Sequence, residues 1–243
     1  RACFSGWLGG TGPSVVVATG AAGIGKSALI GASLAAFAAG PDRLVLSARC
    51  ANTESVPYRA WDPVVDLLSE RLLALPRAEA DALASADTPS LVKLFPVLAR
   101  VPALAFGVDA FAPDDPVERR QAAFRGFGAL LERLGQTRRL IVAMDEAVWG
   151  DEDSAALLDD LAAHATPNLC LVVAHREGQA EGAPLIEAAR EAGLRWGGLG
   201  TLHLPPLSGA DAEALLAELL GEHLPADRSG LLEQAEGSPF LLV

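Results

Sequence analysis

One stretch limits what this chain can fold into more than any other, and it reads Gly20-Ala21-Ala22-Gly23-Ile24-Gly25-Lys26-Ser27. A glycine, four further residues and then Gly-Lys-Ser form the pattern of a phosphate-binding loop. Apolar residues 15–18 precede the stretch, and the helix-forming residues 28–38 follow it. Strand, loop and helix in this order are the context that the motif requires, whereas a glycine-rich turn before a helix would match it only by chance. The sequence therefore predicts a nucleotide site built on this loop.

The residue types in the loop suit the binding of a triphosphate. Glycines let several backbone N–H groups converge on phosphate oxygens, and the positive end of the helix that follows faces the anion. Lys26 supplies a positive charge for the outer phosphates, and Ser27 offers a hydroxyl to the Mg²⁺ that bridges them. We expect the nucleotide to contact Gly20, Ala21, Ala22, Gly23, Ile24, Gly25, Lys26, Ser27 and Ala28.

A second signal comes from the apolar residues 140–144, which end in Asp145-Glu146. Such a run is typical of a central strand buried on both faces. Asp145 would then stand at the end of a strand beside the loop, where a carboxylate can hold Mg²⁺ together with Ser27. Glu146 could orient or deprotonate the attacking water, which makes Glu146 and Lys26 the candidate catalytic residues. The alternative is that Glu146 is only a solvated residue at a strand end.

A third signal follows the apolar residues 169–174, where His175 and Arg176 come next. An arginine at the end of a neighbouring strand can reach the γ-phosphate, because its fork of donors matches phosphate oxygens. The spacing alone fits a surface arginine equally well. The 4 histidines are isolated and the 3 cysteines are widely spaced, so we expect neither a histidine or cysteine metal site nor a disulfide framework.

Apolar strands and amphipathic helices alternate along most of the chain, and this alternation predicts an α/β fold with a parallel sheet flanked by helices. The expected strands cover residues 14–18, 43–48, 140–144, 169–174 and 201–204. The expected helices cover residues 28–38, 60–73, 117–135, 154–163 and 183–192. Residues 76–116 are rich in proline, and we interpret them as a helical insertion or irregular helical connection whose clearest helix is 90–100. The simpler interpretation is a packed excursion on the surface.

The character of the chain changes after Pro205-Pro206, where only helices are expected, at 209–220 and 228–236. We therefore expect a nucleotide-binding P-loop domain over residues 1–207 and the beginning of a truncated helical lid domain over residues 208–243. The sequence starts at Arg1 rather than Met and stops in an apolar run, which suggests a segment of a longer protein.

Charge and hydropathy exclude several classes of function. The formal net charge of -12 opposes direct contact with nucleic acid or with an anionic membrane by this segment. No apolar run is long enough for a membrane span, and residues 1–13 lack the pattern of a secretion signal. We therefore expect a cytoplasmic protein.

Several motifs together resemble the ATPase module of the STAND class, as found in large LuxR-type (LAL) transcriptional regulators. They are the loop, Arg49-Cys50, Val56-Pro57-Tyr58, residues 145–151 (Asp-Glu-Ala-Val-Trp-Gly-Asp), the strand ending in Arg176, residues 204–208 (Leu-Pro-Pro-Leu-Ser) and residues 236–240 (Glu-Gly-Ser-Pro-Phe). The resemblance covers nearly the whole chain, and residues 76–116 are its least diagnostic part. Two positions depart from the pattern, because Val148 replaces a common His and Ser238 replaces the usual Asn.

The resemblance implies an ASCE-type, AAA-like sheet in which the Arg176 strand separates the Asp145 strand from the loop strand. It also implies that the nucleotide is ATP or ADP, and that Pro239 approaches it from the lid within Gly237-Ser238-Pro239. Members of the class rest with ADP and assemble with ATP. The resemblance therefore implies a homo-oligomer in the ATP state, with sensor and effector domains further along the same chain.

Our leading hypothesis is a regulatory ATPase that hydrolyses ATP slowly and acts as a nucleotide-dependent conformational switch. The alternative is a free-standing phosphotransferase that passes the γ-phosphate to a small acceptor, with residues 76–116 as the acceptor lid. A third interpretation, a DNA-dependent motor or loader, conflicts with the acidic charge balance.

Overall fold

The computed structural model of the chain describes residues 14–242 except residues 41, 52–55, 106–111, 165, 167 and 222–227. Within this part, strands and helices alternate as expected up to residue 204, and helices alone follow. No helix of the described residues combines the length and the apolar character needed to cross a bilayer.

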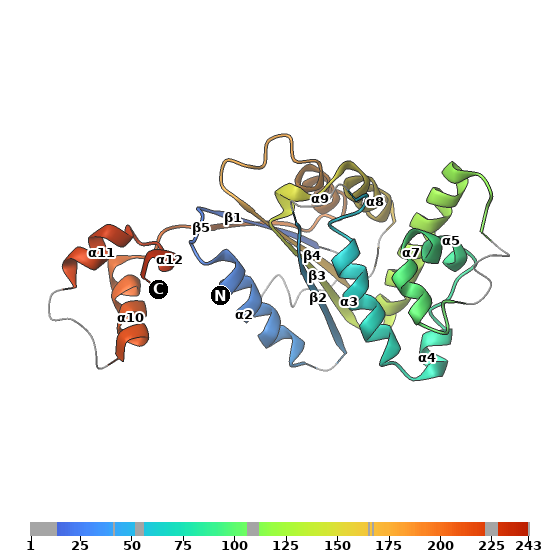
Figure 1. Ribbon diagram of the computed structural model, residues 1–243, viewed down its shortest axis with the longest axis horizontal. Helices are drawn as coiled ribbons and strands as arrows, with labels where there is room; N and C mark the ends of the chain where they lie inside the picture. Colours follow the sequence, from blue (N-terminus) through green and yellow to red (C-terminus); the bar gives the residue numbers. More distant parts are fainter. Residues whose placement is uncertain are drawn as a thin grey trace.

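The centre of the molecule is a five-stranded sheet in the order β2-β3-β4-β1-β5, and each neighbouring pair is parallel (Figure 1). The strands are β1 (Ser14–Gly20), β2 (Arg43–Arg49), β3 (Arg139–Asp145), β4 (Leu169–Arg176) and β5 (Leu199–Leu204). The predicted α/β fold with a parallel sheet is confirmed. The order implied by the resemblance is confirmed too, because the strand that ends in Arg176 lies between the other two.

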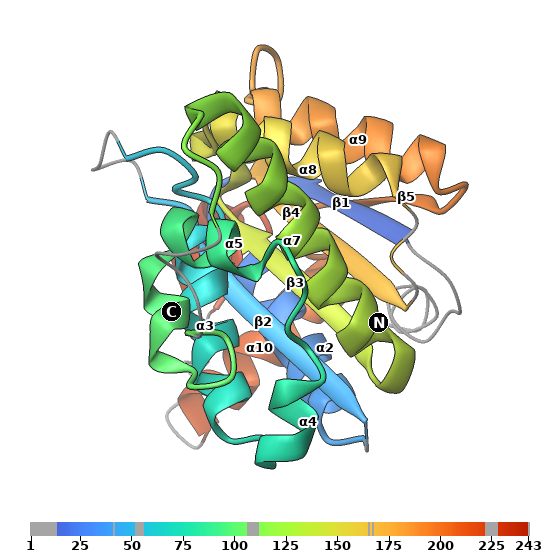
Figure 2. The ribbon, with the colours of Figure 1, turned by 90° about the vertical axis from the view of Figure 1, so that its right-hand side faces the viewer.

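Both faces of the sheet are covered by helices, but unequally (Figure 2). Helix α2 (Lys26–Ala38) covers one face and buries Ile30, Leu34 and Phe37 against it. The opposite face carries the larger core, formed with α3 (Asp62–Leu73), α7 (Pro116–Thr137), α8 (Glu152–Ala163) and α9 (Pro184–Arg195). The central strands β3 and β4 are buried on both sides, which explains why they read as continuous apolar runs.

The helix predicted over residues 90–100 is wrong in detail. The structure has α5 (Thr88–Leu94) and then a separate 3₁₀ turn, η1 (Pro96–Arg100). Proline disfavours the helical conformation of the residue before it, and Phe95 is extended at φ −121 and ψ 85. Pro96 therefore ends one helix and begins the next turn.

The proline-rich insertion packs into the main core. It contains α4 (Arg77–Asp81), α5 and η1, and Leu91, Phe95 and Leu98 are buried with α3 and α7. Helices α5 and α7 approach closely at Gly126, because a Cβ there would lie 2.8 Å from the Asp87 carbonyl oxygen. The segment is thus more than a surface excursion, since it supplies part of the larger core.

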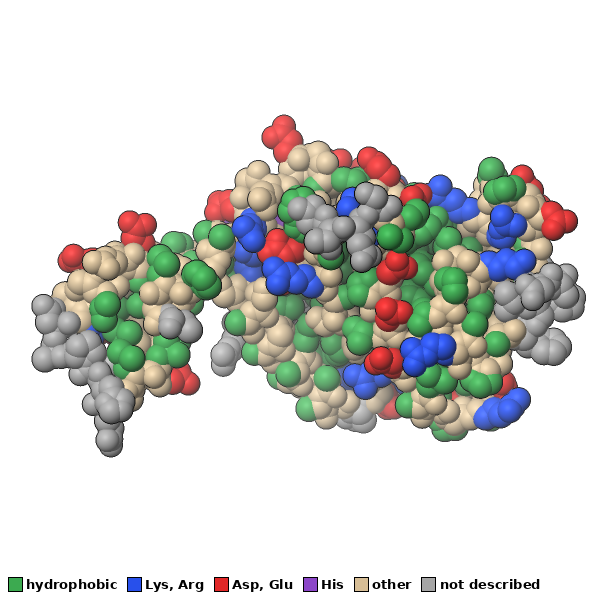
Figure 3. All heavy atoms as spheres, viewed as in Figure 1, with side chains coloured by type: hydrophobic (Ala, Val, Ile, Leu, Met, Phe, Trp, Pro, Cys, Tyr) green, Lys and Arg blue, Asp and Glu red, His purple; other side chains and the backbone are tan. Residues whose placement is uncertain are grey.

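In the described residues, three helices follow β5, namely α10 (Gly209–Leu220), α11 (Ser229–Ala235) and α12 (Pro239–Leu242). Ser208 caps the first of them, since its hydroxyl accepts a hydrogen bond from the Asp211 amide at 3.2 Å. Ala212, Leu216 and Ala235 are their buried apolar residues. Figure 3 shows these helices beside the rest of the molecule, joined to it through a narrow neck.

Replacing Phe95 with alanine tests whether the insertion belongs to the core. Phe95 is 2% exposed and its ring lies 5.7 Å from that of Tyr58 and 6.0 Å from that of Phe127, centroid to centroid. We expect F95A to lower the free energy of unfolding by about 3–5 kcal/mol in urea titrations. The control V117A, at a side chain that is 64% exposed, should change it by less than about 0.5 kcal/mol. A small loss in F95A, or a separate early transition, would mean that the insertion folds apart from the sheet.

Candidate nucleotide site

The predicted loop connects the end of β1 to the start of α2 at the carboxyl edge of the sheet (Figure 1). Gly23 and Gly25 have φ angles of 71 and 91, in the left-handed region that glycine adopts without strain. Gly20 is required for a different reason, because a Cβ there would lie 2.8 Å from the Leu204 carbonyl oxygen on β5. Ile24 is buried beneath the loop, so only its backbone could face a ligand.

Lys26 is the first residue of α2, and its side chain folds back over the start of the loop. Its ammonium donates hydrogen bonds to the carbonyl oxygens of Gly20 and Ala21, both at 2.9 Å. Burial lowers the pKa of this group, the Glu146 and Asp145 carboxylates raise it, and Arg176 lowers it again. An ammonium has three donors, so Lys26 can brace the loop and still contact a phosphate.

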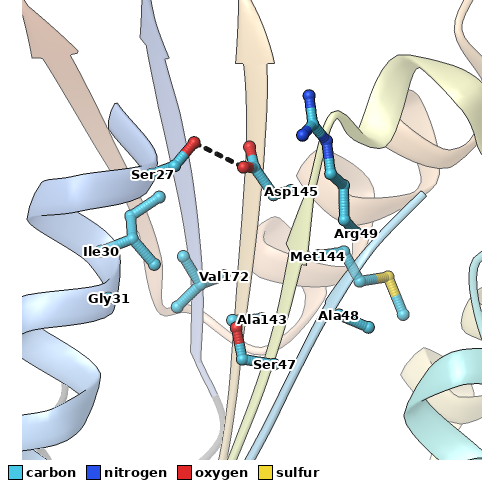
Figure 4. Close-up of a pocket in the computed structure, with 10 residues that line it drawn as sticks. All are labelled: Ser27, Ile30, Gly31, Ser47, Ala48, Arg49, Ala143, Met144, Asp145 and Val172. Carbon is cyan, nitrogen blue, oxygen red and sulfur yellow. Dashed lines mark hydrogen bonds between the residues drawn. The ribbon is translucent and has the colours of Figure 1, made fainter. Parts of the chain in front are cut away.

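Ser27 and Asp145 meet at the mouth of the site, although they are 118 residues apart in the sequence. The Ser27 hydroxyl donates a hydrogen bond of 2.5 Å to Asp145 Oδ2, and Figure 4 shows the two side chains pointing at one another. The other carboxylate oxygen, Oδ1, accepts from the Glu146 amide at 2.9 Å. A hydroxyl beside a carboxylate is the oxygen donor set that suits Mg²⁺, so these residues fit the metal role predicted for them.

Glu146 follows β3 in an unusual backbone conformation, with φ 53 and ψ 41. A left-handed residue other than glycine costs on the order of 1–3 kcal/mol and persists only where the surroundings impose it. Its Oε1 atom lies 3.4 Å from Arg176 Nη2 and 3.5 Å from Arg49 Nη2. The predicted catalytic carboxylate is therefore held between two guanidinium groups.

Arg49 is the residue of this site that the sequence prediction did not assign to it. It ends β2 and is paired in register with Asp145 on β3. Its position at the end of a strand is the same signal that drew attention to Arg176 on β4. A search for an arginine at the end of every predicted strand would therefore have identified Arg49.

The later residues of the Asp145–Asp151 motif join the segments that follow β2 and β3. Asp151 caps α8 by accepting from the Ser154 amide at 2.6 Å, and it also accepts from the Arg59 amide at 3.1 Å. Ser154 accepts from the Ala60 amide at its hydroxyl and from the Trp61 indole N–H at its carbonyl oxygen. These contacts join residues 59–61 to the start of α8, which gives the end of the motif a structural role.

The Gly237-Ser238-Pro239 segment lies against the loop. The Phe240 amide donates a hydrogen bond of 3.3 Å to the Gly23 carbonyl oxygen. A Cβ added at Gly23 would lie 2.7 Å from Phe240 Cβ, and one added at Gly25 would lie 3.8 Å from Pro239 Cγ. The two loop glycines therefore leave room for the C-terminal helices as well as for the turn.

The structure thus brings together Lys26, Ser27, Asp145, Glu146 and Arg176, and Pro239 lies beside Gly25 of the loop. Ala28 lies on the exposed side of α2. Beside the Ser27–Asp145 pair is a pocket of about 230 Å³ between α2 and the sheet, largely apolar and lined by Ser27, Ile30, Gly31, Ser47, Ala48, Arg49, Ala143, Met144, Asp145 and Val172 (Figure 4). In the described residues, no three His, Cys, Asp or Glu side chains are grouped to hold a metal.

A family model described as "AAA ATPase domain" matches residues 1–173. The match includes the loop, β3 and most of β4, and it ends before Arg176 and the C-terminal helices. A search of curated proteins found no match for the chain. The placement of Arg176 and Pro239 in the site therefore rests on the geometry described above.

Thiol labelling tests the packing immediately behind this site. Cys50 donates its amide to the Asp145 carbonyl oxygen at 2.9 Å, and burial raises the pKa of its thiol to about 12, with the Asp145 charge adding to the rise. The neutral thiol stabilises the folded chain below the ordinary pKa of 9.0, and this contribution is lost as the pH rises towards 12. In a C3S variant at pH 8, iodoacetamide should label Cys50 far more slowly than in urea. Equal rates in the two conditions would contradict the packing.

Proposed function

Because the chain belongs to the AAA ATPase domain family, we propose that it binds ATP and ADP with Mg²⁺ at the Gly20–Ser27 loop and acts as a nucleotide-dependent conformational switch. In this proposal it is the regulatory ATPase domain of a multidomain signal-transduction protein, a transcriptional regulator of the STAND class. Hydrolysis is slow, and the output is a change of conformation.

The arrangement of charges supports nucleotide binding at the loop. Lys26 places a buried positive charge beside the carbonyl oxygens at the start of the loop, where it would neutralise the outer phosphates of a nucleotide. Ser27 and Asp145 would hold Mg²⁺, which when bound bridges and neutralises phosphate oxygens. Arg176 lies close enough to Lys26 to affect its pKa, so its guanidinium can contact the same terminal phosphate.

One observation carries the proposal of a switch, namely the contact of the C-terminal helices with the loop. Phe240 and Pro239 rest on Gly23 and Gly25, which belong to the segment that would enclose the phosphates. A ligand shifts a conformational equilibrium only by its differential affinity for the two states. ATP and ADP differ in the γ-phosphate. Because α12 contacts the loop directly, a change of the loop between the two nucleotides would change the contact with α12.

The setting of Glu146 supports slow hydrolysis. A general base must be free to accept a proton from the attacking water. Glu146 instead faces the guanidinium groups of Arg49 and Arg176, and its side chain is only 15% exposed. Turnover therefore requires that these ion pairs loosen first.

Partners follow from the same proposal. The C-terminal helices would pass the nucleotide state to sensor and effector domains of the same chain, and the ATP form would self-associate. The net charge of -12 argues against direct contact of this segment with nucleic acid or an anionic membrane surface. Such a segment would work in the cytoplasm.

A second candidate, the phosphotransferase, is favoured by a polar pocket next to Arg49. The pocket has a volume of about 440 Å³ and is lined by Arg49, Ala51, Arg59, Asp62, Pro63, Asp66, Phe95, Pro96 and Val97. The insertion contributes to it through η1, whereas most of the insertion is buried in the core. The two candidates separate in an ADP-release assay, since a panel of small hydroxyl and amine acceptors accelerates ADP formation only for the transferase.

The chain has only two lysines, and this allows a matched test of nucleotide binding by calorimetry. We expect K26A to weaken both MgATP and MgADP by about 10- to 100-fold, because a charge-assisted hydrogen bond contributes about 1.5–3 kcal/mol. K93A, at an exposed position on α5, should leave both affinities unchanged. Undiminished binding by K26A would refute the proposed site.

A further inference from the structure

Arg49 has the reach and the surroundings of a ligand-binding residue. Its side chain is 71% exposed, and among the described residues its guanidinium forms an ion pair with Glu146. It stands at the rim of the pocket that also holds Ser27 and Asp145 (Figure 4). An exposed ion pair of this kind contributes about 0–1 kcal/mol, so a stronger anion can displace Glu146 from it.

Arg176 approaches the same carboxylate from the other side. Strands β2 and β4 flank β3, and each ends in an arginine whose Nη2 atom lies within 3.5 Å of Glu146 Oε1. Two guanidinium groups thus converge on one oxygen that carries part of a single negative charge. Together with Lys26, they place three cations against the two carboxylates Asp145 and Glu146. The cluster has an excess of positive charge that a phosphate would neutralise.

We infer that Arg49 is a second arginine that reads the γ-phosphate, so that Arg49 and Arg176 together distinguish ATP from ADP. This inference rests on the proposed nucleotide-binding function. A terminal phosphate carries more charge than a carboxylate and offers several oxygens to the planar fork of an arginine. With ATP, both arginines turn from Glu146 to the phosphate, and this is the loosening of the two ion pairs that turnover requires. With ADP, they remain on Glu146.

The test compares the affinities of the full chain for MgADP and for the magnesium complex of an ATP analogue with a non-hydrolysable β,γ-imido bridge. We expect R49A to weaken the analogue by about tenfold or more, as the loss of a charge-assisted hydrogen bond requires, while ADP changes by less than about twofold. The affinity of R49K for the analogue should lie between those of R49A and the parent chain, because lysine keeps the charge but lacks the planar fork of donors. R71A removes an exposed arginine on α3 and serves as the matched control.

The possible outcomes separate the inference from the proposed function. If the parent chain binds neither nucleotide, the proposed function fails, and the role of Arg49 fails with it. If the parent chain binds both and R49A leaves the ratio of the two affinities unchanged, Arg49 is a surface arginine and only the inference is overturned. An R49A variant that hydrolyses ATP faster at an unchanged ratio overturns it too, since Arg49 would then only restrain Glu146. Circular dichroism of R49A confirms that the fold is intact in each case.

Discussion

The hydrogen bond between the Ser27 hydroxyl and the Asp145 carboxylate joins the two halves of the site. It requires the start of α2 and the end of β3 to reach the same edge of the sheet, and the strand order ensures this. Because every strand pair is parallel, the loop after β1, Asp145 at the end of β3 and Arg176 at the end of β4 all lie at the carboxyl edge. Buried apolar runs in β3 and β4 hold these ends in place, so the core and the site depend on the same strands.

The loop is also the junction between the sheet and the C-terminal helices. Its glycines permit the turn, and the same absence of side chains lets Phe240 pack on Gly23. Gly237 also has no room for a side chain, because a Cβ there would lie 2.6 Å from the Leu207 carbonyl oxygen. A nucleotide on the loop would therefore act on a narrow contact made by a few backbone groups. Such a contact can break and re-form without disturbing either core, which is the property that a switch requires.

Local signals account for what could be predicted from the sequence. The phosphate loop has a fixed spacing, and Asp145 and Arg176 follow apolar runs of the length that is typical of buried strands. The structure ends β3 at Asp145 and β4 at Arg176. Arg49 was not predicted to belong to the site, because β2 is an outer strand with half-exposed residues and the partner of Arg49, Glu146, is far away in the sequence. The helix predicted across Phe95 failed because the effect of Pro96 on the preceding residue outweighed the apolar spacing. The hydrogen bond between the Arg59 amide and Asp151 has a backbone donor, so the residue types in the sequence do not indicate it.

If the γ-phosphate controls the position of the C-terminal helices, a distance between two spin labels measures this control directly. Labels at E213C on α10 and E132C on α7, both exposed sites, report the separation of these helices from the sheet in a C3S background, since the buried Cys50 and Cys170 resist labelling. We expect different distance distributions with MgADP and with the magnesium complex of the imido analogue of ATP, and loss of that difference in K26A at nucleotide concentrations that saturate only the parent chain. Identical distributions with both nucleotides, each bound at saturation, would contradict it.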